Sequence, residues 1–382
     1  MSIGIKKQAV VKIIVGKKLK MSENYTTEEL VIIDYNDLRQ ENNDTLLFPL
    51  LRKAFGNGSL GAIAIRNVPN FVHWKKVCLP MSHTLANLDP DYLEEHLTDA
   101  SSMYNAGWSR GKEAALSGGY GSFYYNPITD QPGTEEDRST YPASYPCNKW
   151  PSEDILPGFQ EATKTLGTIM KEATVLLSKH IDAYAQHHCP QYPHLLLYNS
   201  MKDTEKVKGR LLYYYPQNST NHNDDTTKKW IGWHNDSGFL TALAGDLYVN
   251  HETGQQVDFD DSNSGLLIKN RKGEIIKAMI PFDCMAVQIG ECVQIITGGA
   301  VQATSHCVLG SPKVARISHP CFIDVLPSFP LSLPHGSNRD DAIQVDEAVP
   351  PLSNRWTHDG MTFGNFLQTT FEQYYEWSPE SK

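Results

Sequence analysis

The spacing of apolar residues differs between the two halves of the chain. In the first half, apolar residues recur at every third or fourth position in two segments, which predicts helices at 45–55 and 159–186. Short apolar runs predict strands at 31–34 and 60–65. Residues 100–158 are rich in Gly, Ser, Tyr and Pro without a sustained period, so we predict long loops there. This part of the chain is therefore expected to be mixed α/β.

The pattern changes at about residue 210, where short alternating or β-branched runs are separated by turn signals. These runs predict strands at 211–215, 239–249, 265–269, 285–289, 293–297, 304–309 and 314–325. Several strands with short intervals are typical of an antiparallel barrel or jelly roll. A last helix is expected at about 362–377. The predicted fold class is therefore mainly β with flanking helices, with a jelly-roll core that follows an N-terminal α/β region.

Composition and charge narrow the classes of partner. The 382 residues include 40% hydrophobic and 20% charged residues, which are values of a folded globular protein, and no apolar run is long enough to span a bilayer. The net charge is −10, and the first twenty residues hold six lysines and no acid, which leaves about −16 for the rest. A protein with this negative charge repels phosphate backbones. We therefore expect its partner to be a small-molecule substrate rather than a nucleic acid or a membrane.

The two remaining compositional features concern the N-terminus and the cysteines. We expect residues 1–28 to be a disordered basic extension, and an amphipathic membrane or targeting segment is the alternative.

The seven cysteines are scattered and odd in number, and they include no C-x-x-C pair. This pattern argues against a disulfide framework and against a zinc site, so a reducing cytoplasm is the expected location.

A candidate metal site lies at the start of the predicted strand 239–249. His234 and Asp236 are two residues apart, and alternate residues of a strand point to the same side. With His306 they form a set of two histidines and one carboxylate, which leaves positions open on Fe(II) for an oxidant and O2.

Two further H-x-D pairs are present, and neither is expected to bind metal. His180 and Asp182 lie in the predicted long helix, where residues two apart point in nearly opposite directions. His222 and Asp224 lie in a polar stretch that we interpret as a solvated loop.

Arg316 and Ser318 are candidates for a carboxylate site. They also share one face of a predicted strand, ten residues beyond His306. An arginine fork can bond a carboxylate at two points, and a neighbouring hydroxyl adds a donor. This pair is therefore suited to the distal carboxylate of 2-oxoglutarate.

These motifs together resemble the 2-oxoglutarate/Fe(II)-dependent dioxygenase family that includes isopenicillin N synthase. The resemblance covers most of the chain from about residue 30, and its elements occur in the order of the family. The matching segments are 31–34, 60–68, 210–216 (similar to R-L-N-Y-Y-P), 234–241, 265–266, 288–291, 305–306 and 316–318.

The resemblance implies both a site and a reaction. It implies that His234, Asp236 and His306 bind iron, that Arg316 and Ser318 hold 2-oxoglutarate, and that Tyr215 donates its hydroxyl to the same cosubstrate. It also implies Fe(II) and 2-oxoglutarate as cofactors, with ascorbate as an accessory reductant. The expected reaction is oxidation of a small metabolite by O2, with release of succinate and CO2. Aromatic candidates for the substrate wall are Tyr120, Phe123, Tyr124 and Trp233.

The family also implies a domain order. We expect a dioxygenase α/β and helical region at 29–205, a double-stranded β-helix (jelly-roll) core at 206–330, and a C-terminal segment with a helix at 331–382. The chain departs from the family pattern at Tyr213, where Asn is usual, at Cys307, where a basic residue is common, and in a polar insert at 250–263. The lysine-rich N-terminus has no counterpart in the family.

Two other functions remain open from the sequence. One is an Fe(II) oxidase of the same fold that does not use 2-oxoglutarate, since Arg316 and Ser318 could hold another carboxylate. The other is an inactive binding or sensing module, because fold does not determine function.

Overall fold

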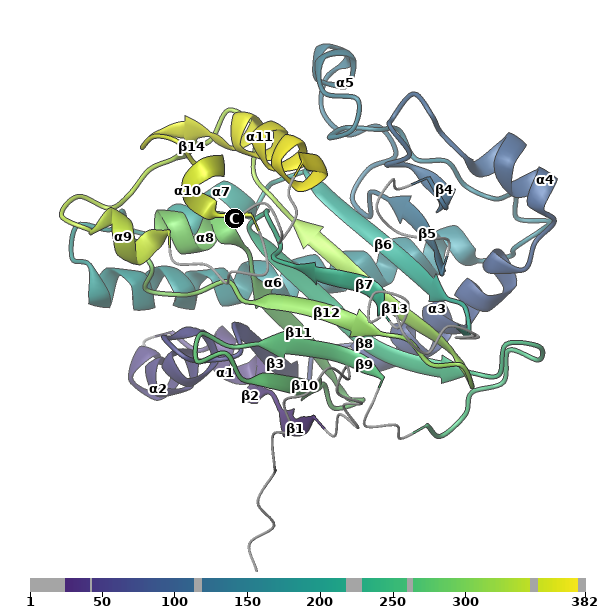
Figure 1. Cartoon of the computed structure of the whole chain (residues 1–382), viewed down its shortest axis with the longest axis horizontal. Helices are drawn as coiled ribbons and strands as arrows, with labels where there is room; N and C mark the ends of the chain where they lie inside the picture. The colour runs from purple at the N-terminus through teal and green to yellow at the C-terminus, as the bar shows by residue number, and fades with distance from the viewer. Residues whose placement is uncertain are drawn as a thin grey trace, which may run out of the picture.

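The structure is a computed structural model that describes residues 25–41, 43–112, 119–217, 229–259, 264–343 and 350–376. Two facing β-sheets form its centre, and helices cover the outer face of the larger sheet (Figure 1). Among the described residues, no helix is long and apolar enough to cross a bilayer. All seven cysteines are free thiols.

The larger sheet has eight strands in the order β2-β3-β11-β8-β13-β6-β5-β4. Its strands are β2 (Val31–Asp34), β3 (Ala62–Arg66), β11 (Cys284–Ile289), β8 (Leu240–Val249), β13 (Ala315–Ile323), β6 (Val207–Tyr214), β5 (Tyr120–Tyr125) and β4 (Gly107–Arg110). Within this sheet the β2–β3 pair is parallel, and the other described pairs are antiparallel.

The smaller sheet has five strands in the order β1-β10-β9-β12-β7. Its strands are β1 (Thr26–Glu29), β10 (Ile275–Met279), β9 (Gly265–Lys269), β12 (Ser305–Leu309) and β7 (Lys229–His234). Side chains of the two sheets meet in one apolar cluster, in which Ala64 and Leu212 of the larger sheet pack with Ile268 and Val308 of the smaller. A separate pair, β14 (Pro330–Leu331) and β15 (Met361–Thr362), lies near the C-terminus.

The longest helix, α6 (Phe159–His188), packs against the larger sheet because its apolar residues recur on one side. Figure 1 shows it running along the sheet, where α2 (Asp44–Phe55) and α3 (Phe71–Ala86) contact it. The other helices are α1 (Tyr35–Arg39), α4 (Pro90–Tyr92), η1 (Leu93–Leu97), α5 (Glu135–Thr140), α7 (Leu196–Met201), α8 (Glu291–Ile296), α9 (Arg339–Ala342), α10 (Leu352–Arg355) and α11 (Phe363–Glu376).

The predicted loops at 100–158 contain two strands of the larger sheet, β4 and β5, and this part of the sequence interpretation was wrong. Their glycines and serines concealed the strand pattern. Gly121 lies against the ring of Trp108, and a Cβ at this position would collide with that ring. Glycine is therefore used here for side-chain packing within a strand rather than for a turn.

Two other predicted segments also differ from the structure. The strand expected at 293–297 is instead helix α8, whose residues are all buried. A short run that is apolar on every side does not distinguish a buried helix from a buried strand. The extension predicted for residues 1–28 overlaps β1, which pairs with β10. Residues 1–24 lie outside the described residues.

The predicted N-terminal region and jelly-roll core are joined in one sheet. Strands β2 and β3 extend one side of the larger sheet, and β4 and β5 extend the other, although all four come from before residue 206. The large apolar core also combines residues from before and after this boundary.

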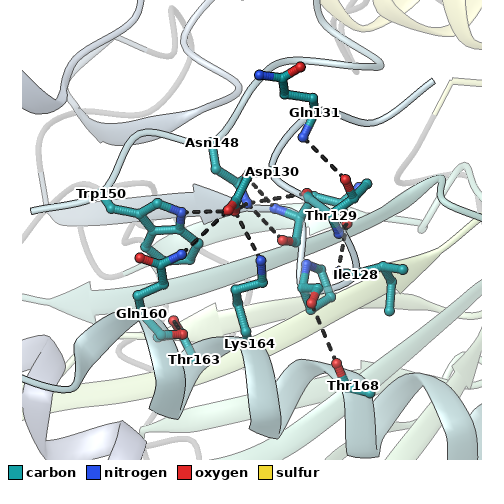
Figure 2. Close-up of polar contacts among 12 residues, drawn as sticks. Ile128, Thr129, Asp130, Gln131, Asn148, Trp150, Gln160, Thr163, Lys164 and Thr168 are labelled. Carbon is teal, nitrogen blue, oxygen red and sulfur yellow. Dashed lines mark hydrogen bonds and ion pairs between the residues drawn. The ribbon is translucent and has the colours of Figure 1, made fainter. Parts of the chain in front are cut away.

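One loop between β5 and α6 is attached to the helix through Asp130. Its carboxylate accepts hydrogen bonds from Asn148 Nδ2 at 2.8 Å, Trp150 Nε1 at 3.0 Å and Lys164 Nζ at 3.1 Å (Figure 2). Burial raises the pKa of Asp130, but these donors outweigh it and the net pKa is lowered. The carboxylate therefore stays charged and holds the loop against α6.

We expect Asp130→Ala to lower the free energy of unfolding by roughly 1 kcal/mol, because charged hydrogen bonds are lost at a carboxylate that is partly solvated. Urea unfolding and amide exchange of the 126–150 loop measure the effect. Asp154→Ala is the matched control, because Asp154 is an exposed acid in the same segment and should change neither quantity. Equal behaviour of the two variants would contradict the proposed attachment.

Candidate metal and carboxylate site

Two histidines and one carboxylate meet in the smaller sheet. His306 of β12 lies directly opposite His234 at the end of β7, and their ring centroids are 4.2 Å apart. Asp236 follows β7, and its Oδ1 lies 3.9 Å from Nε2 of His306. One ligand atom from each residue lies within 4.8 Å of the others. The structure thus brings together the three predicted ligands.

Hydrogen bonds orient both imidazole rings. Nδ1 of His234 lies 2.9 Å from the carbonyl oxygen of Gly232, so Nδ1–H donates there and Nε2 keeps its lone pair. Nδ1 of His306 lies 2.8 Å from Nε2 of Gln288 and 3.3 Å from the carbonyl oxygen of Thr304. Because both contacts lie at Nδ1, Nε2 of His306 is the ring nitrogen that faces Asp236. Nε2 of each ring is then free to bind a metal.

The electrostatic environment also favours metal binding. Burial and the neighbouring His306 lower the pKa of His234, so its imidazole is neutral at physiological pH, as a metal ligand must be. Oδ2 of Asp236 is buried and accepts no hydrogen bond from any residue that the structure describes. A buried carboxylate oxygen without a partner is costly unless a cation binds it. This donor set, with nitrogen and carboxylate but no thiolate, fits Fe(II).

Arg316 and Ser318 lie across the cavity, on β13 of the larger sheet. Both are buried, and both line the same cavity as the three candidate ligands. Nη2 of Arg316 donates to Asp246 Oδ1 at 2.5 Å. Its Nε and Nη1 are buried and have no hydrogen-bond partner among the described residues. The guanidinium therefore has donors available for a second carboxylate.

The cavity lies between the two sheets. The larger sheet contributes Arg210, Leu212, Tyr214, Thr241, Leu243, Gly245, Asp246, Gln288, Arg316, Ser318, Pro320 and Phe322, and the smaller sheet and adjoining segments contribute Ile231, His234, Asp236, Leu266, Ile280, His306 and Val308. Its polar groups are thus surrounded by aliphatic side chains.

Tyr215, the residue predicted to contact the cosubstrate, does not line this cavity. Its hydroxyl donates to the carbonyl oxygen of Ala86 at 3.0 Å, and its ring stacks under Arg110. Tyr214 lines the cavity instead. Tyr213, at the position where the family usually has Asn, also points away, and its hydroxyl bonds to Nδ1 of His251 at 2.8 Å.

The four aromatic residues proposed for the substrate wall lie on different faces of the two sheets, and not all of them are near the cavity. Tyr120 and Tyr124 flank Arg210, a cavity residue, at 5.4 and 5.0 Å from their ring centroids. Phe123 points to the opposite face of β5 and packs in the apolar core, and Trp233 packs on the outer side of the smaller sheet. Only the two tyrosines therefore remain near the cavity.

His180 and Asp182 both lie in α6, and their side chains contact different residues. Nε2 of His180 lies 2.9 Å from the carbonyl oxygen of Leu38. Asp182 instead accepts from the Tyr192 hydroxyl at 2.6 Å and from the backbone N–H of Leu197 at 2.9 Å. The two side chains therefore have separate structural partners. His222 and Asp224 lie outside the described residues.

Asp246 and Gln288 were not selected from the sequence as site residues. The signal for Asp246 was present, because it is the one acid within the apolar run that became β8. Gln288 belongs to a segment that matched the family, but no residue pattern connected it to His306. Their roles depend on contacts between strands that are far apart in the chain.

Several solved structures share this fold. A full-length Neurospora crassa protein, in complex with alpha-KG and 5-formyluracil, matches with a TM-score of 0.63 and 19% identity over 88% of this chain and 93% of that chain. A putative 2OG-Fe(II) oxygenase family protein of Caulobacter crescentus matches with a TM-score of 0.63 and 16% identity, covering 90% and 99% of the two chains. JOX2, in complex with 2OG, Fe and JA, has a TM-score of 0.59 and 15% identity, covering 92% and 91%. No family model and no curated protein sequence matches the chain. The chain has the fold of the 2OG-Fe(II) oxygenases, with the predicted jelly-roll core.

We expect His234→Ala, Asp236→Ala and His306→Ala each to weaken Fe(II) binding by at least about a hundredfold, because each removes one of three protein ligands. Anaerobic Fe(II) titration of the purified variants measures this. His180→Ala is the control, since it removes a buried imidazole outside the cavity. Loss of iron from the control alone would show that the metal site is elsewhere.

Proposed function

We propose that this chain is an Fe(II)- and 2-oxoglutarate-dependent dioxygenase that oxidises a small organic metabolite. The observation that carries the proposal is the presence of two complementary groups in one cavity. One is the cluster of His234, Asp236 and His306. The other is the buried guanidinium of Arg316, with two donor nitrogens that have no hydrogen-bond partner in the described part of the chain.

In this proposal, Fe(II) is held by His234, Asp236 and His306, and 2-oxoglutarate is held by Arg316 and Ser318. Bound Fe(II) and 2-oxoglutarate would support a reaction with O2. In this reaction 2-oxoglutarate loses CO2 to become succinate, and the substrate is hydroxylated, desaturated or closed into a ring. The residues of this chain fix the positions of the reactants. Arg316 donates to the distal carboxylate, and the two imidazoles keep their orientation through Gly232 and Gln288.

The walls of the cavity exclude water from the reaction. Leu212, Leu243, Leu266 and Val308 line the cavity and pack in the apolar cluster between the sheets. A dry environment strengthens each electrostatic contact and protects a reactive oxidant from side reactions. Two structures with this fold were solved with the small molecules thymine and JA, and a small organic substrate suits this cavity too. The free thiols are consistent with a reducing compartment, and we propose the cytoplasm.

One observation favours the alternative of an oxidase that does not use 2-oxoglutarate. Asp246 already supplies a carboxylate to Nη2 of Arg316, so the guanidinium has an internal partner. The two remaining donor nitrogens favour a second, bound carboxylate. An inactive binding module would bind metal and consume no O2.

The function is tested by incubating the Fe(II)-loaded protein with 2-oxoglutarate, ascorbate and a metabolite extract under air. We expect succinate and O2 consumption to rise together when the extract contains a substrate. O2 uptake without succinate would support the oxidase. Metal binding without uptake of O2 across fractionated extracts would support the binding module.

We predict that Arg316→Leu raises the 2-oxoglutarate concentration needed for half-saturation about a hundredfold, which corresponds to about 2.7 kcal/mol. Arg316→Lys keeps the charge but loses the two-point geometry, so it should have a smaller effect in the same direction. Anaerobic titration of the Fe(II) protein with 2-oxoglutarate measures both.

Arg66→Leu is the matched control for these variants, because Arg66 forms a surface ion pair with Asp283 outside the cavity. Its affinity for 2-oxoglutarate should equal that of the wild type. Wild-type affinity in both Arg316 variants would assign Arg316 to a structural role and support the oxidase. Weaker Fe(II) binding in the same variants would instead indicate damage to the whole site.

A further inference from the structure

A buried series of polar side chains joins the C-terminal part of the chain to the metal cluster. Arg355, the last residue of α10, contacts Glu291 at the start of α8. Glu291 accepts a hydrogen bond from Nδ2 of Asn235 at 3.0 Å. Oδ1 of Asn235 accepts from the hydroxyl of Ser305 at 2.8 Å. Asn235 lies between the ligands His234 and Asp236, and Ser305 directly precedes the ligand His306.

Asn235 connects the two segments that carry the ligands. Because side chains alternate along an extended segment, Asn235 points to the opposite side from His234 and Asp236. It is 4% exposed and does not line the cavity. Its amide cannot contact the metal position directly, but it joins the segment of His234 and Asp236 to the strand of His306.

Glu291 makes two hydrogen bonds to the segment that contains Asn235 and Asp236. Its backbone N–H donates to the carbonyl oxygen of Asp236 at 2.8 Å, and its carboxylate accepts a hydrogen bond from the side-chain amide of Asn235. The carboxylate is fully buried, as is the guanidinium of Arg355, which donates to it at 2.5 and 2.6 Å. Nη2 of Arg355 also donates to the carbonyl oxygen of Pro350 at 3.0 Å.

A fully buried ion pair contributes little to stability compared with an apolar pair of the same size, because both charges lose their hydration. Such a pair does fix geometry, since a fork of two hydrogen bonds allows one relative orientation. The pair of Glu291 and Arg355 therefore provides a rigid acceptor for the amide of Asn235.

We infer that Asn235 is a positioning residue that sets the separation of the His234–Asp236 segment from His306, held by Ser305 and by the Glu291–Arg355 pair. The inference rests on the proposed function, because it concerns the same metal cluster. It assigns to the C-terminal segment a role in metal geometry, although that segment contributes no residue to the cavity in the described part of the chain.

The test is an anaerobic titration of the metal-free full-length protein with Co(II), read by affinity and by the visible ligand-field spectrum. We expect Asn235→Ala to bind Co(II) tenfold to a hundredfold more weakly and with a changed spectrum, which is the usual range for residues that orient metal ligands. Ser305→Ala should weaken binding less, because the contact between Asn235 and Glu291 remains. Ser305→Thr keeps the hydroxyl and should retain wild-type affinity.

The matched control is Asn126→Ala, which removes another buried amide with several hydrogen bonds at a site outside the cavity. It should lower the unfolding midpoint without changing Co(II) affinity or the spectrum. An equal loss of Co(II) affinity in Asn126→Ala would show that Asn235 acts only through general stability, and would overturn the inference.

The remaining outcomes separate the inference from the proposed function. Wild-type affinity and spectrum in Asn235→Ala overturn the inference alone. If that variant does not fold, wild-type Co(II) binding by Ser305→Ala overturns it in the same way, and weaker binding rescued by Ser305→Thr supports it. A wild-type protein that binds no Co(II) overturns the proposed metal site, and the inference with it.

Discussion

The pairing of β12 with β7 is the constraint on which the site depends, because it places His306 opposite His234 in the register of the smaller sheet. A shift of one residue would turn either imidazole to the other face of the sheet. β12 is also paired with β9 on its other side, where His306 lies opposite Ile268. Pairing on both sides fixes the register of β12. Because side chains alternate along an extended chain, Asp236 then points to the same side as His234.

The second sheet supplies the other half of the site. β13 runs between β6 and β8, so Arg316 has Tyr214 on one side and Tyr248 on the other. The guanidinium therefore lies within a low-dielectric environment, where an unpaired donor is costly. The facing sheets thus separate two functions, since one carries the candidate metal ligands and the other carries the candidate carboxylate site. Helices α2, α3 and α6 cover the outer face of the larger sheet and exclude water from its core.

Two ion pairs with buried guanidinium groups lie at this site. Arg316 contacts Asp246 within the cavity, and Glu291 contacts Arg355 behind the ligand segments. The guanidinium of each pair is costly to desolvate, and the carboxylate of Glu291 is fully buried as well, so neither pair is explained by stability alone. The pairs differ in one respect. The donors of Arg316 are only partly used, which suits ligand binding, whereas both oxygens of Glu291 accept hydrogen bonds, which suits a fixed support.

The sequence alone predicted most strands and helices, because these depend on the period of side chains within one segment. It also proposed the three candidate metal ligands, Arg316 and Ser318, which the structure places on one cavity. It was insufficient wherever the face of a strand had to be known, as Tyr215 and Tyr214 show. It also failed for β4, β5 and α8, whose local patterns are ambiguous without their packing partners. Contacts between distant segments, such as Asp246 with Arg316 and Glu291 with Asn235, were decided only by the tertiary structure, because strand order and register bring those residues together.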